Sequence, residues 1–362
     1  MFRRIVTGAI AVAVLVAPAG AAVAAPSGSA LQAALEAVHE AGMPGAFAEV
    51  RDGRRTFTPT AGVIDVKTGE PVRDGLRHRV GSITKTFTAT TVLQLSGERR
   101  IDLDAPIGRY LPRLVPADIG RAVTVRMLLN QTSGIGDYDS VLLSTLEGFI
   151  EMGRTTYRPE QLVKLGIEAG PTHAPGTDWA YSNTNYVLAG LIVEKVTGRS
   201  LESEVHRRIL RPLKLRDITR YNMSWGWAVG DLVSTAADLN TFYRALLTGK
   251  VLNKRLLAEM QTTVDDYYGL GLYSVRLPCG VFWGHDGGTI GHQTISLHSP
   301  DGKKQVTYAQ SMAFYQTSET EPHPIDVAST EFLLTALCGD DQQPAARSAT
   351  APIDLRRFMV DQ

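Results

Sequence analysis

The sequence predicts an α+β fold in which one antiparallel sheet is built from both ends of the chain and flanked by helices. Alternating, strand-like patterns are confined to the two ends, whereas helical spacing dominates the middle. This distribution is typical of a sheet domain with an all-helical domain inserted into it. We expect the sheet domain to comprise residues 25–81 and 250–339, and the inserted domain to comprise residues 82–249.

The first 24 residues have the three regions of a secretory signal peptide. A basic start precedes an apolar stretch over residues 5–17, and Ala22-Val23-Ala24 forms a small-residue cleavage site. A retained membrane anchor is the alternative, but the apolar stretch is short for a bilayer span and is interrupted at Pro18. We therefore expect a signal peptide over residues 1–24 and no membrane anchor after its cleavage.

The N-terminal part of the sheet domain begins with a helix. Residues 30–41 have helical spacing that stops at Gly42, and two strands are expected over 46–51 and 56–64, on either side of Asp52-Gly53.

The inserted domain shows helical spacing in five segments. These segments are Thr84–Gly97, Thr124–Asn130, Asn185–Thr197, Leu201–Ile209 and Ala236–Leu247.

Strand patterns return after Gly269. They cover Leu270–Val275, Val281–Gly284, Thr294–His298 and Gln305–Gln310. Residues 299–302 form the hairpin turn between the last two strands, and a final helix is expected over 326–337. The tail over 340–362 is rich in polar and small residues, and we expect it to be disordered.

The charge balance gives no global attraction to nucleic acid or to anionic lipid. The chain has 37 basic and 37 acidic residues, and removing the signal peptide takes away Arg3 and Arg4 and no acid. The mature chain then carries 35 basic against 37 acidic residues, a net charge of −2. Such a near-neutral surface predicts neither nucleic acid nor membrane partners.

Ser82 and Lys85 form the most informative pair in the sequence. Residues three apart lie on the same face of a helix, so the Lys85 amine can reach the Ser82 hydroxyl. If a helix begins at Ser82, its unpaired N–H groups lie where an oxyanion would develop. A serine and a lysine at this spacing also occur by chance on solvated helix faces, so further motifs are needed.

Two later motifs support an acyl-transfer site. Tyr181-Ser182-Asn183 places a phenol and an amide two residues apart, as a segment aimed into a cleft would. His285-Asp286-Gly287, followed by Gly288, is typical of a strand edge at which glycine lets a substrate approach closely.

Taken in this order, the three motifs resemble those of the penicillin-recognising serine hydrolases. The family includes the class C β-lactamases, and the chain is most similar to secreted serine-type D-Ala-D-Ala carboxypeptidases. The resemblance extends to other segments, including Tyr110-Leu111-Pro112 and Leu128–Gly134. It implies a β-lactamase/transpeptidase-like fold.

The resemblance also implies roles for the motif residues. Ser82 would form the acyl-enzyme, and either Lys85 or Tyr181 would be the general base. The N–H groups of Ser82 and Gly288 would form the oxyanion hole, Asn183 would hold the substrate amide, and His285 would replace a lysine of related enzymes.

No metal or other cofactor is needed for this chemistry. The histidines His285, His292 and His298 point in differing directions along their expected strands and have no cysteine nearby, which argues against a zinc site.

Several residues depart from the carboxypeptidase pattern. Asp286 and Gly288 stand where such enzymes have threonines that hold the terminal carboxylate of the peptide. Tyr273 replaces an arginine of those enzymes, which leaves Arg276 as the nearest cation. An ionised Asp286 would repel a substrate carboxylate, so we expect weak selectivity for it. Trp225 either lines the substrate pocket or packs in the core.

The two cysteines, Cys279 and Cys338, are expected to form one disulfide in an exported protein, with two buried free thiols as the alternative. Related carboxypeptidases carry a bridge in what looks like the same place.

The sequence therefore predicts a secreted, extracellular or cell-wall-associated serine hydrolase, most similar to D-Ala-D-Ala carboxypeptidases or related D-specific peptidases. An esterase, D-amino-acid amidase or β-lactamase on the same scaffold is an alternative, because a fold does not fix a substrate. A non-catalytic penicillin- or peptide-binding sensor is a further alternative. The expected partners are small peptides, amides, esters, peptidoglycan stem peptides or β-lactams, and we expect a monomer.

Overall fold

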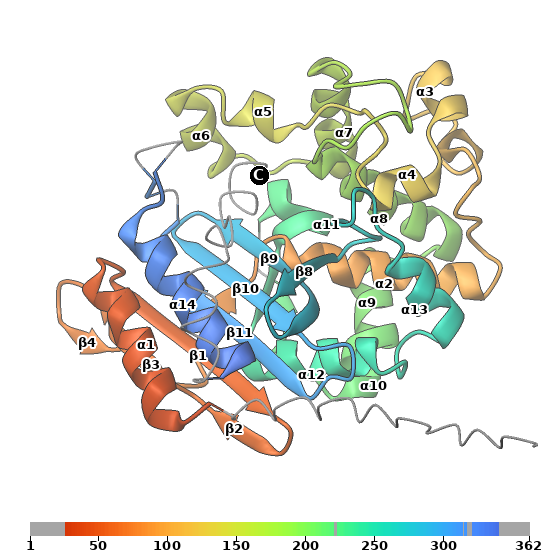
Figure 1. Cartoon of the computed structure of the whole chain (residues 1–362). Helices are drawn as coiled ribbons and strands as arrows, with labels where there is room; N and C mark the ends of the chain where they lie inside the picture. The colour runs from red at the N-terminus through yellow and green to blue at the C-terminus, as the bar shows by residue number, and fades with distance from the viewer. Residues whose placement is uncertain (1–25, 221–222, 314, 317–320, 340–362) are drawn as a thin grey trace, which may run out of the picture.

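The computed structural model describes residues 26–220, 223–313, 315–316 and 321–339, and Figure 1 shows an antiparallel sheet beside a mainly helical region. The predicted signal peptide over 1–24 and the predicted disordered tail over 340–362 lie outside the described residues. The α+β fold class is confirmed.

The large sheet has the strand order β4-β3-β1-β11-β10-β9-β8, and β2 pairs with β1. Its strands are β1 (Gly45–Asp52), β2 (Arg55–Phe57), β3 (Thr60–Asp65), β4 (Glu70–Pro71), β8 (Tyr273–Leu277), β9 (Gly280–Thr289), β10 (His292–His298) and β11 (Lys304–Gln310). Strands β1 and β11 pair from Ala46 opposite Gln310 to Asp52 opposite Lys304. The two ends of the chain are thus joined at the centre of the sheet, as predicted.

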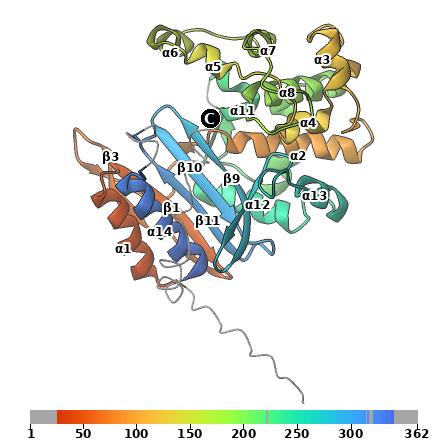
Figure 2. The same cartoon turned by 45° about the horizontal axis from the view of Figure 1, so that its top comes forward.

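Helices cover both faces of this sheet (Figures 1 and 2). Helices α1 (Gly28–Glu40) and α14 (Pro324–Cys338) lie together on one face, and α12 (Ala236–Leu247) contacts β1, β10 and β11 on the other. Helix α1 begins where the Ser27 hydroxyl accepts the Ala30 N–H, and it buries an apolar stripe formed by Leu31, Leu35 and Val38. The sheet therefore has an apolar core on the α1 and α14 side.

The helical region surrounds α2 (Ile83–Gly97), which is buried on nearly all sides from Ile83 to Leu93. A helix that is buried all round needs neighbours on every face. Its neighbours include α8 (Asn183–Thr197), α9 (Leu201–Val205), α11 (Trp227–Gly230) and α13 (Lys254–Met260).

Shorter helices complete this region. They are η1 (Ile107–Arg109), α3 (Ala117–Ala122), α4 (Val125–Leu129), α5 (Asp139–Leu142), α6 (Leu146–Met152), α7 (Pro159–Glu168), η2 (His206–Leu210), α10 (Arg211–Leu213) and η3 (Ser224–Gly226).

Two predicted strands differ from those observed. The strand expected over 56–64 is divided into β2 and β3, because Pro59 between them has no N–H to donate to a ladder. The strand expected over Leu270–Val275 begins only at Tyr273, because Gly271 adopts a φ of +80° close to the side chain of Ala89.

The expectation of an all-helical inserted domain is wrong in detail. A small second sheet joins β5 (His78–Arg79), β7 (Leu232–Ser234) and β6 (Thr219–Arg220), so two strands lie within residues 82–249. Strands of two or three residues offer too few alternating positions for a sequence pattern. The predicted helix over Leu201–Ile209 is also irregular, since α9 passes into the wider turns of η2.

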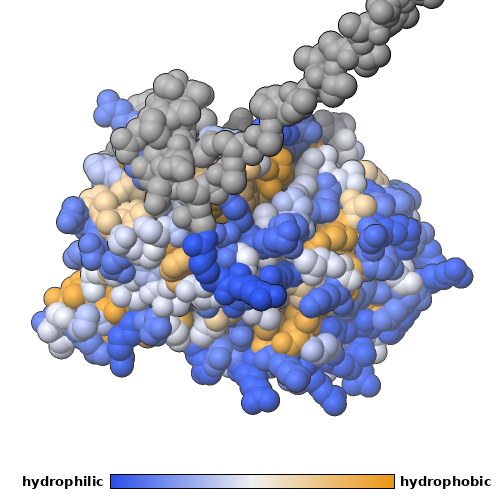
Figure 3. All heavy atoms as spheres, turned by 60° about the horizontal axis from the view of Figure 1, so that its bottom comes forward, coloured by the Kyte–Doolittle hydropathy of each residue, from blue (hydrophilic) through white to orange (hydrophobic). Residues whose placement is uncertain are grey.

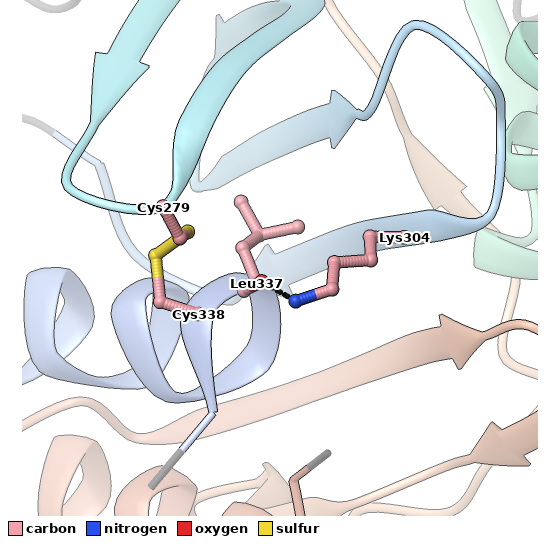
Figure 4. Close-up of a disulfide and its surroundings, with 4 residues drawn as sticks. All are labelled: Cys279, Lys304, Leu337 and Cys338. Atoms are coloured by element: carbon pink, nitrogen blue, oxygen red, sulfur yellow. Dashed lines mark hydrogen bonds between the residues drawn. A yellow bond between two sulfur atoms is a disulfide. The ribbon is translucent and has the colours of Figure 1, made fainter. Parts of the chain in front are cut away.

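The predicted disulfide joins Cys279 and Cys338, whose Cα atoms are 5.4 Å apart (Figure 4). Cys279 lies in the turn between β8 and β9, and Cys338 is the last residue of α14. The Lys304 ammonium donates to the Leu337 carbonyl at 3.0 Å beside it. The end of α14 is thus fixed to the sheet from two directions.

The molecular face drawn in Figure 3 is largely hydrophilic, with separate hydrophobic areas. Within the described residues, no helix has the length and apolar character needed to cross a membrane. Over the same residues, no group of three or more His, Cys, Asp or Glu side chains is placed to hold a metal ion.

Candidate active site

Ser82 lies at the N-terminus of α2, where the predicted nucleophile and its activator meet. It has helical backbone angles, and the residue is 6% exposed. One turn along, the fully buried Lys85 donates from Nζ to Ser82 Oγ at 2.8 Å and to the Val229 carbonyl at 3.2 Å. The structure therefore brings together the pair that the spacing predicts.

Tyr181 completes the nucleophile's hydrogen bonds. It precedes α8, and its hydroxyl donates to Ser82 Oγ at 2.9 Å. Lys85 Nζ lies 4.9 Å from the centre of the Tyr181 ring. Ser82, Lys85 and Tyr181 thus form one compact group from two separate segments of the sequence.

Burial gives the two candidate bases opposite properties. Removal from water lowers the pKa of Lys85 to about 7, although Asp137, Asp139 and Asp286 oppose this shift. Burial raises the pKa of Tyr181 well above its ordinary value. At neutral pH a substantial fraction of Lys85 is therefore a neutral amine, whereas Tyr181 remains a phenol.

Gly287 and Gly288 bring strand β9 against the start of α2. A methyl group on Gly287 would lie 2.6 Å from the Ser82 amide nitrogen, and one on Gly81 would lie 2.6 Å from the Gly288 carbonyl oxygen. Only glycine permits this approach without a shift of the backbone. The backbone of β9 therefore lies beside the Ser82 amide, as the predicted oxyanion hole requires.

His285 is buried on β9, and its tautomer follows from its two partners. Nδ1 lies 2.6 Å from the Asp286 carbonyl oxygen, so Nδ1 must carry the hydrogen, and Nε2 accepts from the Tyr268 hydroxyl at 3.0 Å. Burial and the nearby Lys85 lower the pKa of His285 to about 3. The residue predicted to replace a lysine is thus a neutral imidazole.

Asp286 is also buried, with 3% of its surface exposed. Burial raises its pKa to about 7, while a hydrogen bond from Tyr273 is among the effects that oppose the rise. Tyr273 lies beside His285, with ring centres 5.4 Å apart. Arg276, the nearest cation predicted from the sequence, is exposed. It pairs with Val281, so it lies at the end of β8 away from His285 and Asp286.

Asn183 holds two carboxylates that the sequence interpretation missed. Its amide nitrogen donates to Asp137 at 3.0 Å and to Asp139 at 2.8 Å. The other Asp137 oxygen accepts the Asp139 N–H at 3.2 Å, whereas the second oxygen of Asp139 has no hydrogen-bond partner within the described residues. Asp137 and Asp139 lie shortly after the Thr-Ser-Gly segment in the sequence, but only the fold places them against Asn183.

The two carboxylates are poorly compensated. Burial raises the pKa of Asp137 and of Asp139, and the charge of Asp137 raises that of Asp139 further. Lys85 acts in the opposite direction on both. The region beside Asn183 is therefore acidic and would be stabilised by a further positive charge.

Gln131 connects this region to the Tyr-Ser-Asn motif. It has a positive φ of 65°, and its side-chain oxygen accepts from the Ser182 N–H at 3.2 Å and from the Asn185 amide at 2.6 Å. Gln131 thus positions the segment that carries Tyr181 and Asn183.

Trp225 is half-buried and packs against the core of the helical region, and its carbonyl accepts the Tyr138 hydroxyl. Its predicted contact with substrate stays a prediction. Trp179 and Tyr268 form an aromatic group with Tyr181 that the sequence interpretation missed, with the Trp179 ring centre 6.5 Å from that of Tyr181. Trp179 lies two residues before Tyr181 in the sequence, whereas Tyr268 is brought beside them only by the fold.

Comparison with known proteins gives a consistent result. The Beta-lactamase family model matches residues 30–328. The structure of a D-stereospecific amidohydrolase from Streptomyces sp. superposes with a TM-score of 0.76 at 40% identity, covering 87% of this chain and 100% of that one. The structure of a D-amino acid amidase from Ochrobactrum anthropi SV3 has a TM-score of 0.76 at 23% identity, covering 86% and 98%, and this likeness concerns the fold.

Curated relatives match over shorter segments. Esterase EstB from Burkholderia gladioli is 35% identical over 195 residues, which are 50% of this chain and 48% of the esterase. A D-aminopeptidase from Brucella anthropi is 31% identical over 179 residues, 49% of this chain and 33% of that protein. The chain thus spans about half or less of these two relatives.

The match of the family model over most of the chain agrees with the fold and with the Ser82, Lys85 and Tyr181 geometry. The chain therefore belongs to the beta-lactamase family, among the penicillin-recognising serine hydrolases.

Proposed function

We propose that this serine hydrolase is a D-stereospecific amidohydrolase that acts on amides, and on the related esters, of D-amino acids with a free α-amino group. The D-Ala-D-Ala carboxypeptidase expected from the sequence is the less favoured reading. The difference lies in which charged group of the substrate is recognised, an ammonium or a carboxylate.

The observation that carries this proposal is the carboxylate pair at Asn183. One oxygen of Asp139 has no hydrogen-bond partner within the described residues, and both carboxylates have raised pKa values. A buried charge is stable only when paired. An α-ammonium group would supply the missing charge and hydrogen-bond donors next to the nucleophile.

The other side of the site gives less support for binding a carboxylate. His285 is neutral at the position of a lysine, Tyr273 occupies the position of an arginine, and Arg276 lies away from the motif. A terminal carboxylate placed there would meet Asp286 rather than a cation from these positions.

The reaction follows from the protonation states. Neutral Lys85 accepts the Ser82 proton while Ser82 Oγ attacks the carbonyl carbon of the substrate. The backbone N–H groups of Ser82 and Gly288 stabilise the resulting oxyanion. Collapse of the tetrahedral intermediate breaks the C–N bond, and the leaving amine takes a proton through Tyr181 from protonated Lys85. Water then attacks the acyl-enzyme carbonyl and gives a proton to neutral Lys85. The second tetrahedral intermediate collapses and breaks the bond to Ser82 Oγ, which takes that proton back from Lys85 as the D-amino acid leaves.

The names of the relatives support the same class. The Streptomyces protein is a D-stereospecific amidohydrolase, and the Brucella protein is a D-aminopeptidase. Esterase EstB is consistent with ester turnover through the same acyl-enzyme. We also propose that the enzyme is exported, as the signal-like N-terminus and the disulfide suggest. The predicted monomeric state stays a prediction.

A stereochemical assay combined with mass spectrometry tests the proposal. D-phenylalaninamide should be hydrolysed at least about a hundredfold faster, in kcat/KM, than L-phenylalaninamide, and a slow D-ester should label the peptide that contains Ser82. Ser82→Ala should show neither turnover nor label. Equal turnover of both enantiomers, or a label elsewhere, would overturn the proposal.

A further inference from the structure

A cavity of about 470 Å³ lies against helix α2, lined by residues other than Ser82, Lys85 and Tyr181. It is formed by α2, α9, α11 and the small sheet that contains β6 and β7. Its volume is in the range of sites that hold a small organic molecule. The catalytic chemistry described above makes no use of it.

Much of the cavity wall is apolar. The apolar lining residues are Phe87, Leu201, Val205, Leu210, Ile218 and Leu232. A second hollow of about 420 Å³ is its neighbour, and the residues that line both are Ser200, Glu202, Arg220, Trp227 and Asp231.

The polar part of the cavity is acidic. Asp231 is 5% exposed and pairs one carboxylate oxygen with Arg220, and its other oxygen has no hydrogen-bond partner within the described residues. Arg220 also donates to the Trp227 carbonyl at 2.9 Å. Glu202 lies exposed at the rim, so the lining contains two carboxyl groups and one arginine.

We propose that this cavity is a second ligand site, which takes a small organic ammonium ion with an apolar alkyl or aryl body. The ammonium group binds the unpartnered oxygen of Asp231. Its body lies against the apolar wall and the Trp227 ring, which also attracts cations.

Helix α11 connects this site to the nucleophile. Its successive carbonyls at Trp227, Ala228 and Val229 accept from Arg220, Thr88 and Lys85, at 2.9, 2.9 and 3.2 Å. Trp227, Arg220 and Thr88 line the cavity, whereas Lys85 belongs to the nucleophile. A ligand that moves Trp227 or Arg220 therefore changes the carbonyl that holds the Lys85 amine.

The occupied cavity consequently alters the rate of acylation at Ser82. The coupling requires that the ligand favour one position of α11 over another. The ligand would change the rate constant for acylation of Ser82 without occupying the substrate site, so its effect differs from competitive inhibition.

Binding is measured first, with 2-phenylethylammonium, which has no acyl group to transfer. Because the acidic pair at Asn183 could also bind it, calorimetry uses the variant Asp137→Asn/Asp139→Asn. We expect one molecule to bind, and 2-phenylethanol, with the same body and no charge, to bind at least tenfold more weakly.

Two further changes locate the binding. Asp231→Asn, added to the Asp137→Asn/Asp139→Asn variant, should weaken binding at least tenfold. Ser203→Phe, which places a large side chain into the cavity from α9, should weaken binding to the same extent. Ser203→Ala is the matched control and should leave binding unchanged. Circular dichroism and the Tm identify variants that fail to fold. No binding by the double variant, or unchanged binding after both Asp231→Asn and Ser203→Phe in folded protein, overturns the site.

Coupling is measured on the wild type with an activated ester that lacks an amino group. Saturating 2-phenylethylammonium should change the acylation rate constant at least threefold, and Asp231→Asn should abolish this change. Binding at Asp231 without any change in acylation overturns the coupling through α11. The calorimetric comparison involves no turnover, so it remains readable even if the proposed substrate class is wrong.

Discussion

Lys85 contacts the Ser82 hydroxyl directly, and it is fully buried. Both properties suit a general base. Burial lowers its pKa to about 7, against the influence of three nearby carboxylates. Tyr181 donates to the same Ser82 oxygen, but its pKa is raised well above its ordinary value. The choice between two bases that the sequence left open therefore favours Lys85.

The pH dependence of acylation should report this lysine. Only the neutral amine accepts a proton, so the acylation rate should rise through about pH 7 and level off above it. Lys85→Arg, which stays protonated, should lower the rate by about 10²- to 10⁴-fold. The acylation rate is measured by burst kinetics with an activated ester across pH, and Lys164→Arg, at an exposed lysine, is the control. An acylation rate independent of pH from 5.5 to 8.5 would exclude Lys85 as the base.

Asp139 should act both on the substrate and on Lys85. Asp139→Asn removes a negative charge that raises the lysine pKa, so the rising limb of the pH profile should move to lower pH. It should also lower kcat/KM for D-amino-acid amides about 10- to 100-fold, as expected for a lost hydrogen bond to a charged group. The exposed Asp118→Asn is the control, and an unmoved limb together with full activity would contradict both roles.

At the scale of elements, the site depends on how closely β9 approaches the start of α2. A side chain at Gly287 would collide with the Val80 carbonyl and the Ser82 amide. Gly287→Ala should therefore lower kcat/KM by about a hundredfold, since small displacements of catalytic groups have effects of this size. Kinetics and thermal unfolding should be compared with Gly153→Ala, which has room for a methyl group; wild-type activity in the Gly287→Ala variant would show that the contact is not needed.

The observed helices and strands show which features of the fold could be predicted from the sequence. The Ser82 and Lys85 spacing and the terminal strands were identified correctly, because both depend on local periodicity. The division of the strand at Pro59 carried a recognisable signal that the interpretation passed over. Strands β6 and β7 carried none, because their pairing is decided by distant parts of the chain.

The carboxylates at Asn183 were missed for another reason. Asp137 lies just before helix α5 and Asp139 is its first residue, and only the fold brings them to an amide 44 to 46 residues away in the sequence. Contacts of this kind are set by tertiary structure, so the spacing of charged residues cannot predict them.

For the whole molecule, the disulfide should contribute to stability by closing a long loop. Cys279 and Cys338 are 59 positions apart, and the chain-entropy estimate for such a loop is about 4 kcal/mol. Urea unfolding of wild type and of Cys279→Ala/Cys338→Ala should differ by about this free energy. The two curves would coincide if the bridge did not constrain the unfolded chain.

The assignment of the whole molecule depends on which charged group of the substrate it recognises. The most direct test compares kcat/KM for D-phenylalaninamide and for its N-acetyl derivative, in wild type and in Asp139→Asn. The account predicts at least a hundredfold preference of the wild type for the free amine, reduced to less than tenfold by Asp139→Asn. Equal rates for the two amides, or a preference for N-acylated peptides with a free C-terminal carboxylate, would contradict it.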